Sequence, residues 1–415
     1  MYRKASAVFG ITTAPGHGVE LTGLGELLQK ERRGTLALQT RGIEDGSSVA
    51  LGGLVTGGPS TTFVHGACGT DISEVDDLKA ALSRSPSGEF AFVADCLGAV
   101  MAGRDPIGGR PLYQGAAEGI SVVSTIPSLL DALSVPRQPT PPGYLITLRA
   151  GLLTSERYAP NIQRKPFQGS LGQAAARVGA LIRGSLKLRL DGARAVAVAF
   201  SGGLDSSVLA SASAKTRKVL LLSVSTEGSK DMRLATGAAG ELGLELHSIR
   251  VTREDVERAL SQVHLWEGAS TMDRSLAAGF YLASLEAKAQ GFEFLVAGQG
   301  ADEIFGGYNR HFEAATADLS SLKPRLLEEL PGLEAGLRRD ELAISRGGCE
   351  PAFPYADFTL ARLALNLPPQ FLISHGERKV VLREVAKKMG LPPSIVAAPK
   401  RAFQYSSGIQ DLVSG

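Results

Sequence analysis

The chain has 415 residues, 44% of them hydrophobic and 21% charged, which is typical of a globular protein long enough for two cores. Its net charge of +2 provides no overall field that would gather nucleic acid, so we expect no nucleic-acid partner. The three cysteines, Cys68, Cys96 and Cys349, lack C-x-x-C spacing, which argues against a disulfide framework or a zinc site. No apolar run is long enough to span a bilayer. We therefore expect a soluble cytoplasmic protein without a membrane partner.

The first part of the chain, residues 1–158, is predicted to be rich in β-structure. Short apolar runs between glycine turns predict strands at Ala5–Ile11, Thr35–Gln39, Val49–Val55, Glu89–Asp95, Gly98–Ala102, Ile120–Ser124 and Tyr144–Leu148. Helical patterns are few and fall at Leu21–Glu31, Val75–Leu82 and Ile126–Leu133. We expect two packed sheets, followed by a polar, proline-bounded linker at residues 159–170.

The second part, residues 171–415, alternates helical patterns with short buried strands. The strands are predicted at residues 195–200, Val219–Ser225, Glu245–Ile249 and Phe292–Ala297, and beyond Gly306 the pattern is mostly helical. Such alternation predicts an α/β fold with a parallel sheet covered on both faces. In such sheets ligands bind at the carboxyl ends of the strands, so the residues after each strand are the candidates for a site.

The segment SGGLDSS, residues 201–207, directly follows the first of these strands. Its glycines allow a ligand to approach the backbone closely, while the serines and the amides at the start of the next helix can donate hydrogen bonds to an anion. The segment lacks the Lys-Ser/Thr pair of kinase and GTPase loops and the G-x-G-x-x-G pattern of dinucleotide binders. We therefore interpret it as a phosphate or pyrophosphate site, the alternative being a glycine turn needed only for packing.

A second polar segment, GQGADEIFGGY at residues 298–308, follows the strand that ends at Ala297. Asp302 in this segment could simply cap a helix. Paired with Asp205 at a neighbouring strand end, it could instead bind Mg²⁺, which usually takes one or two carboxylates together with phosphate oxygens. The second interpretation predicts a metal site made by Asp205 and Asp302.

These segments resemble the asparagine synthetase family, whose synthetase domain carries SGGLDSS and a later G-x-G-x-D-E-x-F-G-G-Y segment. Further resemblances follow in the family's order at Cys349–Asp357, Lys379–Arg383 and Pro399–Gln404, and the first part resembles the family's glutaminase-type domain at Gly88–Phe92 and Arg104–Tyr113. The resemblance implies an N-terminal glutaminase-like (Ntn-type) β-sandwich domain, residues 1–158, and a C-terminal PP-loop ATP pyrophosphatase domain, residues 171–415.

The resemblance also implies roles for individual residues. Asp205 and Asp302 would hold Mg²⁺, and Lys379 would neutralise charge on the α-phosphate and on the oxyanion formed during acyl transfer. Arg274 falls where the family has an arginine near the acyl substrate. ATP and its pyrophosphate would contact the loop, the backbone beside the adenine and the basic stretch: Phe200, Ser201, Gly202, Gly203, Leu204, Asp205, Ser206, Ser207, Val224, Gly298, Lys400 and Arg401.

The sequence departs from the family at three positions. Tyr2 stands where the glutaminase domain needs a cysteine as its nucleophile, so we expect no hydrolysis of glutamine. Gln299 replaces a family glutamate that helps the amine nitrogen attack the acyl-adenylate, and an amide cannot accept the proton that this nitrogen loses. Ala352 replaces a family arginine. A substitute base could be Glu267, Asp273 or Glu303.

The sequence therefore predicts an AMP-forming ligase of amino-acid biosynthesis that uses ATP and Mg²⁺ to adenylate a carboxylate and then forms an amide. Aspartate and free ammonia are the leading substrates, with ammonia supplied from solution or by a separate protein, and a homodimer is compatible with this prediction. Three alternatives stay open: an amide ligase or cyclase similar to β-lactam synthetase, an RNA-modifying ATP pyrophosphatase, and a non-catalytic nucleotide sensor.

Overall fold

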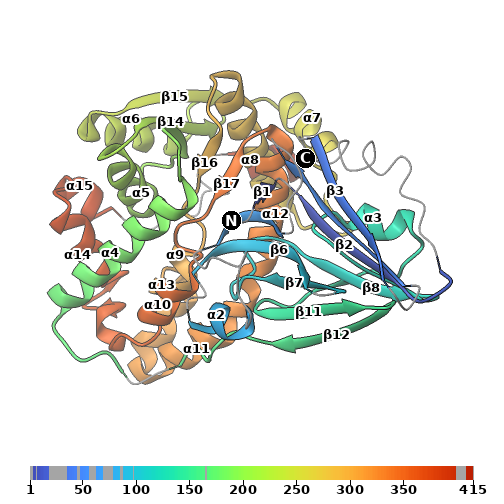
Figure 1. Cartoon of the computed structure of the whole chain (residues 1–415). Helices are drawn as coiled ribbons and strands as arrows, with labels where there is room; N and C mark the ends of the chain where they lie inside the picture. Colours follow the sequence, from blue (N-terminus) through green and yellow to red (C-terminus); the bar gives the residue numbers. More distant parts are fainter. Residues whose placement is uncertain are drawn as a thin grey trace. The chain divides into compact units, whose positions relative to one another are not determined.

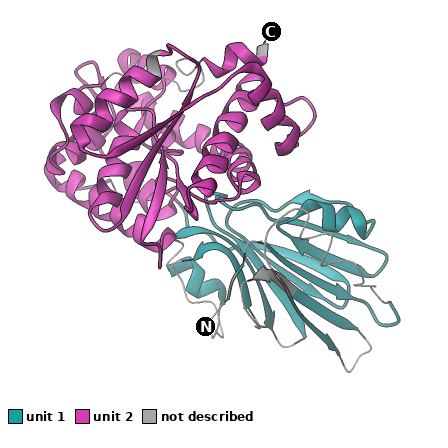
Figure 2. Cartoon of the chain, turned by 90° about the horizontal axis from the view of Figure 1, so that it is seen from above, with its two compact units in different colours: residues 1–161 teal, residues 162–415 magenta. Residues whose placement is uncertain are grey.

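The computed structural model describes residues 3–5, 7–17, 35–43, 47–55, 62–68, 78–84, 87–96, 98–163, 166–398 and 408–414. The chain divides into two compact units, residues 1–161 and residues 162–415 (Figure 2). This division falls within the predicted linker at residues 159–170. Among the described helices, none combines the length and the apolar character needed to cross a membrane.

Unit 1 contains two sheets of six strands each among its described residues. The first has the order β1 (Arg3–Ala5), β5 (Thr62–Cys68), β6 (Gly88–Cys96), β7 (Ala99–Arg104), β11 (Tyr144–Arg149), β12 (Leu152–Arg157). The second has the order β10 (Gln138–Pro139), β8 (Tyr113–Ala117), β9 (Ile120–Ser124), β2 (Val8–Thr13), β4 (Ser48–Val55), β3 (Thr35–Gly42). Neighbouring strands are antiparallel except β1 and β5, which run parallel.

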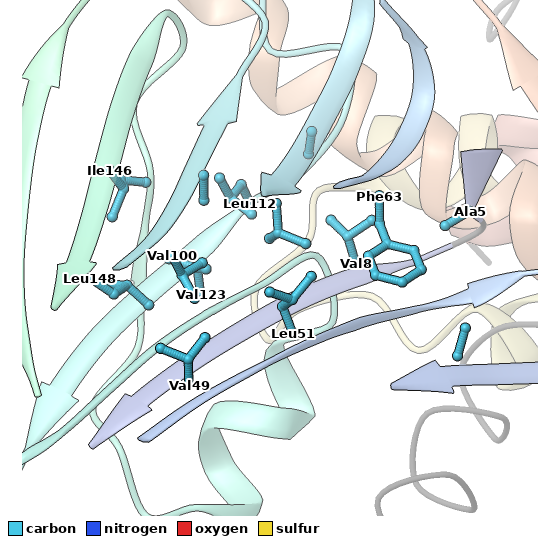
Figure 3. Packing of buried hydrophobic residues seen from close by; sticks show 14 residues of the cluster. Ala5, Val8, Val49, Leu51, Phe63, Val100, Leu112, Val123, Ile146 and Leu148 are labelled. Atoms are coloured by element: carbon cyan, nitrogen blue, oxygen red, sulfur yellow. The ribbon is translucent and has the colours of Figure 1, made fainter. Parts of the chain in front are cut away.

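The core of unit 1 lies between these two sheets. Val100 and Ile146 from the first sheet pack with Leu51 and Val123 from the second (Figure 3). Alternate residues of each strand face opposite sides, so neighbouring side chains such as Phe92 point to the outer face. The prediction of two packed sheets is confirmed.

A short helix covers the outer face of each sheet. On the first sheet, Leu82 of α2 (Leu78–Arg84) is buried with Phe90. On the second, Leu129 of α3 (Pro127–Ala132) is buried with Phe9. Because both faces of the central strand β6 are buried, its residues 90–94 read as a continuous apolar run rather than as an alternating one.

The sequence located most strands of unit 1 and missed others. The strand β12 was missed because it is an exposed, largely polar edge strand, and β5 was missed because its apolar residues are interrupted by His65 and Gly66. The predicted helix Leu21–Glu31 lies outside the described residues, and the helix predicted from Val75 is described from Leu78.

Unit 2 is built on a five-stranded parallel sheet, which confirms the predicted α/β fold. Its strand order is β15 (Glu245–Arg250), β14 (Lys218–Ser225), β13 (Ala195–Ala199), β16 (Phe294–Val296), β17 (Glu350–Ala352). The sequence did not predict β17, because three residues with a central proline carry no strand pattern of their own.

Helices cover both faces of this sheet (Figure 1). The crossovers β13–α5–β14 and β14–α6–β15 advance in one direction, so right-handed connections place α5 (Leu204–Ala214) and α6 (Lys230–Leu242) on one face. The return to β16 runs through α7 (Arg253–Val263) and α8 (Thr271–Ala289), and α8 packs on the other face. The chain thus changes direction between β13 and β16, and their carboxyl ends form a switch point where ligands bind in such sheets.

The remaining helices follow the switch point or pack around the sheet. They are α4 (Leu171–Arg189), α9 (Ala301–Phe305), α10 (Asn309–Ala317), α11 (Leu322–Glu329), α12 (Leu333–Gly347), α13 (Phe358–Ala364), α14 (Val380–Lys388), α15 (Pro393–Val396) and α17 (Ile409–Ser414). Small residues bring α8 and α12 close together: the hydroxyl of Ser284 donates to the carbonyl of Ile344 at 2.6 Å, and a Cβ at Gly347 would lie 2.5 Å from Cβ of Ser284.

Candidate active site

The SGGLDSS segment forms the turn between β13 and α5. Gly202 has a φ of +73°, and a Cβ there would lie 2.6 Å from the carbonyl oxygen of Leu234, so the turn requires glycine. The helix α5 begins behind Gly203, and no side chain of the described residues caps it. Its first N–H groups therefore remain available to an anion, and the helix dipole favours negative charge there.

A cavity opens at the switch point beside this turn. Apolar side chains line one part of it, including Leu222 and Val224 of β14 and Phe280 of α8. The three residues predicted to lie near adenine, Phe200, Val224 and Gly298, all line the cavity, as do Ser201, Asp205, Ser206, Gln299 and Asp302. One cavity thus joins apolar walls suited to a flat ring with the polar loop suited to phosphates.

Lys379 connects the two predicted metal ligands. Its Nζ lies 2.6 Å from Oδ2 of Asp205 and 2.6 Å from Oδ1 of Asp302, and the lysine is only 3% exposed. Lys379 precedes α14 with a φ of +57°, a left-handed conformation that is uncommon for a residue with a side chain. Two carboxylates thus converge on a single cationic atom.

The space around Gly307 is too small for any residue but glycine, which explains the second glycine of the GGY sequence after α9. A Cβ at this position would lie 1.8 Å from Oδ1 of Asp302 and 2.3 Å from Cε of Lys379. Any larger residue would therefore occupy the space where the lysine reaches the carboxylate.

Tyr355 supports the first turn of α5. It lies in the segment that resembles E-A-R-V-P-F-L-D, and its buried hydroxyl donates to the carbonyl oxygen of Asp205 at 3.0 Å. Its ring packs edge-on against Phe305 of α9, with ring centroids 6.2 Å apart. The tyrosine thereby links the two elements that carry Asp205 and Asp302.

A buried polar network behind Gln299 escaped the sequence analysis. The Nε2 of Gln299 donates a short hydrogen bond to Oδ2 of Asp340, which is fully buried on α12. Arg339 donates from Nε to Oδ1 of Asp340 at 2.7 Å and from Nη1 to Oδ1 of Asp273 at 2.9 Å. An arginine and an aspartate on an amphipathic helix are typical of surface residues, so only the fold reveals this network.

The three candidate substitute bases, Glu267, Asp273 and Glu303, do not line the cavity beside the SGGLDSS turn. Tyr308 donates to Oε1 of Glu303 at 2.6 Å, and burial, followed by the charge of Asp302, raises the pKa of Glu303. Asp273 is held by Arg339 and by Ser270 at the start of α8, while Glu267 lines a separate cavity.

Arg274 is not brought to the cluster around Lys379. It is exposed and lines the separate cavity together with His264, Trp266 and Glu267. Ala352, which stands in place of a family arginine, is fully buried in β17. Lys400 and Arg401 lie outside the described residues.

A parallel sheet with an anion-binding turn and paired carboxylates at its switch point is typical of a nucleotide-binding α/β domain. The model of the Asparagine synthase family matches residues 177–342 and 333–413, more than half of the chain. The chain belongs to this family.

Similar proteins carry the same family name. Asparagine synthetase B (glutamine-hydrolysing) of Escherichia coli is 27% identical over 357 residues, covering 81% of this chain and 62% of that protein. The asparagine synthetase (glutamine-hydrolysing) of Mus musculus is 30% identical over 246 residues, covering 56% of this chain and 43% of that protein. The chain thus spans less than two thirds of the length of either relative.

A solved NMN synthetase from Francisella tularensis shows a weaker likeness. It has a TM-score of 0.31 and 14% identity over 59% of this chain and 87% of that chain. The description of the fold therefore rests on the strand order of this chain itself.

Proposed function

We propose that this chain adenylates a carboxylate with ATP and then transfers the acyl group to an amine, releasing AMP and pyrophosphate. The observation that carries the proposal is the convergence of Asp205, Asp302 and Lys379 beside an open anion-binding turn, at the polar end of a cavity with apolar walls. A fully structural role for this turn would not require two carboxylates and a buried lysine at its mouth.

The residues present fit Mg²⁺. Oxygens of Asp205 and Asp302 meet at one cationic position, and Oδ1 of Asp205 is buried without a hydrogen-bond partner among the described residues. Mg²⁺ prefers such carboxylate oxygens and completes its shell with phosphate oxygens and water. Asp205 and Asp302 would hold the ion, which when bound shields the charge on the triphosphate.

Other groups of the chain bind the base and the phosphates and stabilise the charge that develops in the reaction. Leu222, Val224 and Phe280 enclose the base, and the N–H groups at the start of α5 bind phosphate oxygens. In the first step a carboxylate oxygen attacks the α-phosphorus, and the bond to the β-phosphate oxygen breaks. Lys379, released from its two carboxylates, provides positive charge for the α-phosphate and acyl oxygens.

In the second step the amine nitrogen attacks the acyl carbon, the bond to AMP breaks, and one amine proton is lost to a base. Aspartate and ammonia are our leading substrates, because the relatives are named asparagine synthetases. The alternative is an amide ligase or cyclase with another acyl or amine substrate, and the neutral residues Gln299 and Ala352 favour it.

We also propose that unit 1 is a glutaminase-like, Ntn-type scaffold without glutaminase activity. Its two sheets, each covered by a helix, support this assignment. Cys68 and Cys349 are buried, and burial, followed by the charge of Asp95, raises the pKa of Cys96, so none of these thiols is an activated nucleophile. Ammonia would then come from solution or from a separate protein.

A pyrophosphate-release assay tests the function. The purified chain is incubated with ATP, Mg²⁺ and a panel of amino and dicarboxylic acids, with and without ammonium, and AMP, glutamate and product amide are measured in the same reaction. We expect AMP with at least one carboxylate and no glutamate from glutamine. Release of ADP and phosphate in place of AMP and pyrophosphate would contradict the proposed chemistry.

A further inference from the structure

The network behind Gln299 fixes the direction of its side-chain amide. The carboxylate of Asp340 is fully buried and receives Nε of Arg339 at 2.7 Å on Oδ1 and Nε2 of Gln299 on Oδ2. Burial raises the pKa of Asp340, and the adjacent Arg339 guanidinium opposes that rise. A carboxylate paired with arginine only accepts hydrogen bonds, so it must face the NH₂ group of Gln299.

The other end of the amide is therefore free to meet a ligand. With Nε2 turned to Asp340, Oε1 points away from it, and no donor among the described residues reaches Oε1. Gln299 itself lines the cavity, whereas Asp340 does not. A neutral hydrogen-bond acceptor, Oε1 of Gln299, thus faces the cavity, and its orientation is determined by Asp340, which lies outside the cavity lining.

We propose that Asp340 is a positioning residue that holds Oε1 of Gln299 toward the cavity, where Oε1 accepts an N–H of the attacking amine. The inference rests on the proposed function and names the recognition element for its second substrate. It assigns to Gln299 the binding of an amine with at least one N–H and leaves proton removal to another group.

The position of Gln299 favours the amine over the adenine as its partner. Gln299 is three residues before Asp302 on the same turn after β16, at the polar end of the cavity. The apolar walls suited to the base are formed instead by residues such as Leu222 and Phe280. The amide thus lies beside the carboxylates that would hold the metal, where the acyl group is attacked.

The test is the variant Asp340→Asn. Arg339 still requires an acceptor, so the oxygen of the introduced amide faces Arg339 and its NH₂ group faces Gln299. The amide of Gln299 must then turn, presenting NH₂ to the cavity in place of oxygen. With ammonium as the probe, we expect the KM for ammonium to rise by about ten-fold or more, while the KM for ATP and ammonium-independent release of pyrophosphate stay at the parent values.

A double variant separates positioning from a loss of folding. Gln299→Glu combined with Asp340→Asn exchanges the amide and the carboxylate, so that the new amide on α12 donates to the new carboxylate and an oxygen again faces the cavity. We expect the KM for ammonium to return to within about three-fold of the parent. The matched control is Glu341→Gln, which neutralises the adjacent buried carboxylate that accepts from Ser345 at 3.2 Å and should leave this KM unchanged.

The outcomes distinguish this inference from the proposed function. If the parent makes no AMP with any carboxylate, the proposed function fails. If the parent is active and Asp340→Asn keeps the parent KM for ammonium, or raises the KM for ATP equally, the assignment of Asp340 and Gln299 to the amine is wrong. Failure of the double variant to recover while its thermal midpoint matches that of the parent would also overturn it.

Discussion

Gly307 and Lys379 occupy adjoining space so closely that a Cβ on the glycine would lie 2.3 Å from Cε of the lysine. The lysine side chain passes directly over the glycine to reach Asp302, 2.6 Å from its Nζ. Position 307 must therefore be glycine, because the side chain of Lys379 fills the space that a Cβ would occupy.

Replacement of this glycine should displace the lysine. In Gly307→Ala the new methyl group would overlap both Cε of Lys379 and a carboxylate oxygen of Asp302. We expect AMP formation to fall by about 100-fold or more while the fold persists, because misplaced electrostatic groups cost on this order. The control is Gly332→Ala, where a Cβ would meet nothing within 4 Å. Equal activities for the two variants would contradict the requirement.

Removal of the lysine charge should increase the affinity of the nucleotide-free protein for divalent cations. In Lys379→Met the ammonium no longer competes for Asp205 and Asp302, and the two carboxylates repel each other until a cation binds. We expect binding of Mn²⁺ without nucleotide, measured by calorimetry, to strengthen by about ten-fold or more.

The same variant should be less stable without metal than the parent, by ~3–5 kcal/mol, because a buried ion pair loses one partner. Thermal unfolding with and without Mn²⁺ measures this difference. Unchanged Mn²⁺ affinity would show that the two carboxylates do not act together on a cation.

Loss of either carboxylate charge should stop ATP cleavage. Asp205→Asn and Asp302→Asn each retain the side-chain shape while removing one of the two charges that meet at Lys379. We expect no pyrophosphate release above background, with an unchanged circular dichroism spectrum. Release at the parent rate by either variant would remove that residue from the metal site.

Acid should destabilise unit 2 through His311. The imidazole is fully buried, and burial lowers its pKa even though Nε2 lies 2.8 Å from Oε2 of Glu329. The unfolded chain therefore binds more protons than the folded one below about pH 6.5, the ordinary pKa of histidine. Stability falls as the pH drops from about 6.5 toward the folded-state pKa, by at most ~1.4 kcal/mol per pH unit.

The measurement uses Trp266, the single tryptophan of the chain, which lies in unit 2. Its fluorescence follows denaturant unfolding at pH 7.5, 6.5 and 5.5 (about one unit apart, spanning the window in which a histidine changes charge). We expect His311→Gln to lose less stability over this range than the parent. Parallel pH dependences would exclude a contribution from this histidine.

Much of the site could be predicted because its parts have local signatures. The SGGLDSS turn follows a buried strand and precedes a helix, so its conformation and its donors are encoded within a few residues. The placement of Asp302 near Asp205 followed from the rule that parallel strands bring their carboxyl ends to one edge.

The rest depends on contacts between distant segments. The strand β17 exists because Glu350–Ala352 pairs with β16, and no local pattern predicts that pairing. The role of Asp340 depends on Gln299, 41 residues away, and on the close approach of α12 to α8. Arg274, which the resemblance places near the acyl substrate, lines a separate cavity in the fold.

The contact between Lys379 and Asp205 joins residues that are 174 positions apart in the chain. Closing so long a loop costs conformational entropy, whereas a helix forms through local contacts, so we expect this contact to form after the helices that flank it. A newly made chain would acquire its sheet and α5 before the ammonium arrives between the carboxylates. The charge cluster would therefore be complete only when α14 has packed against α5 and α9.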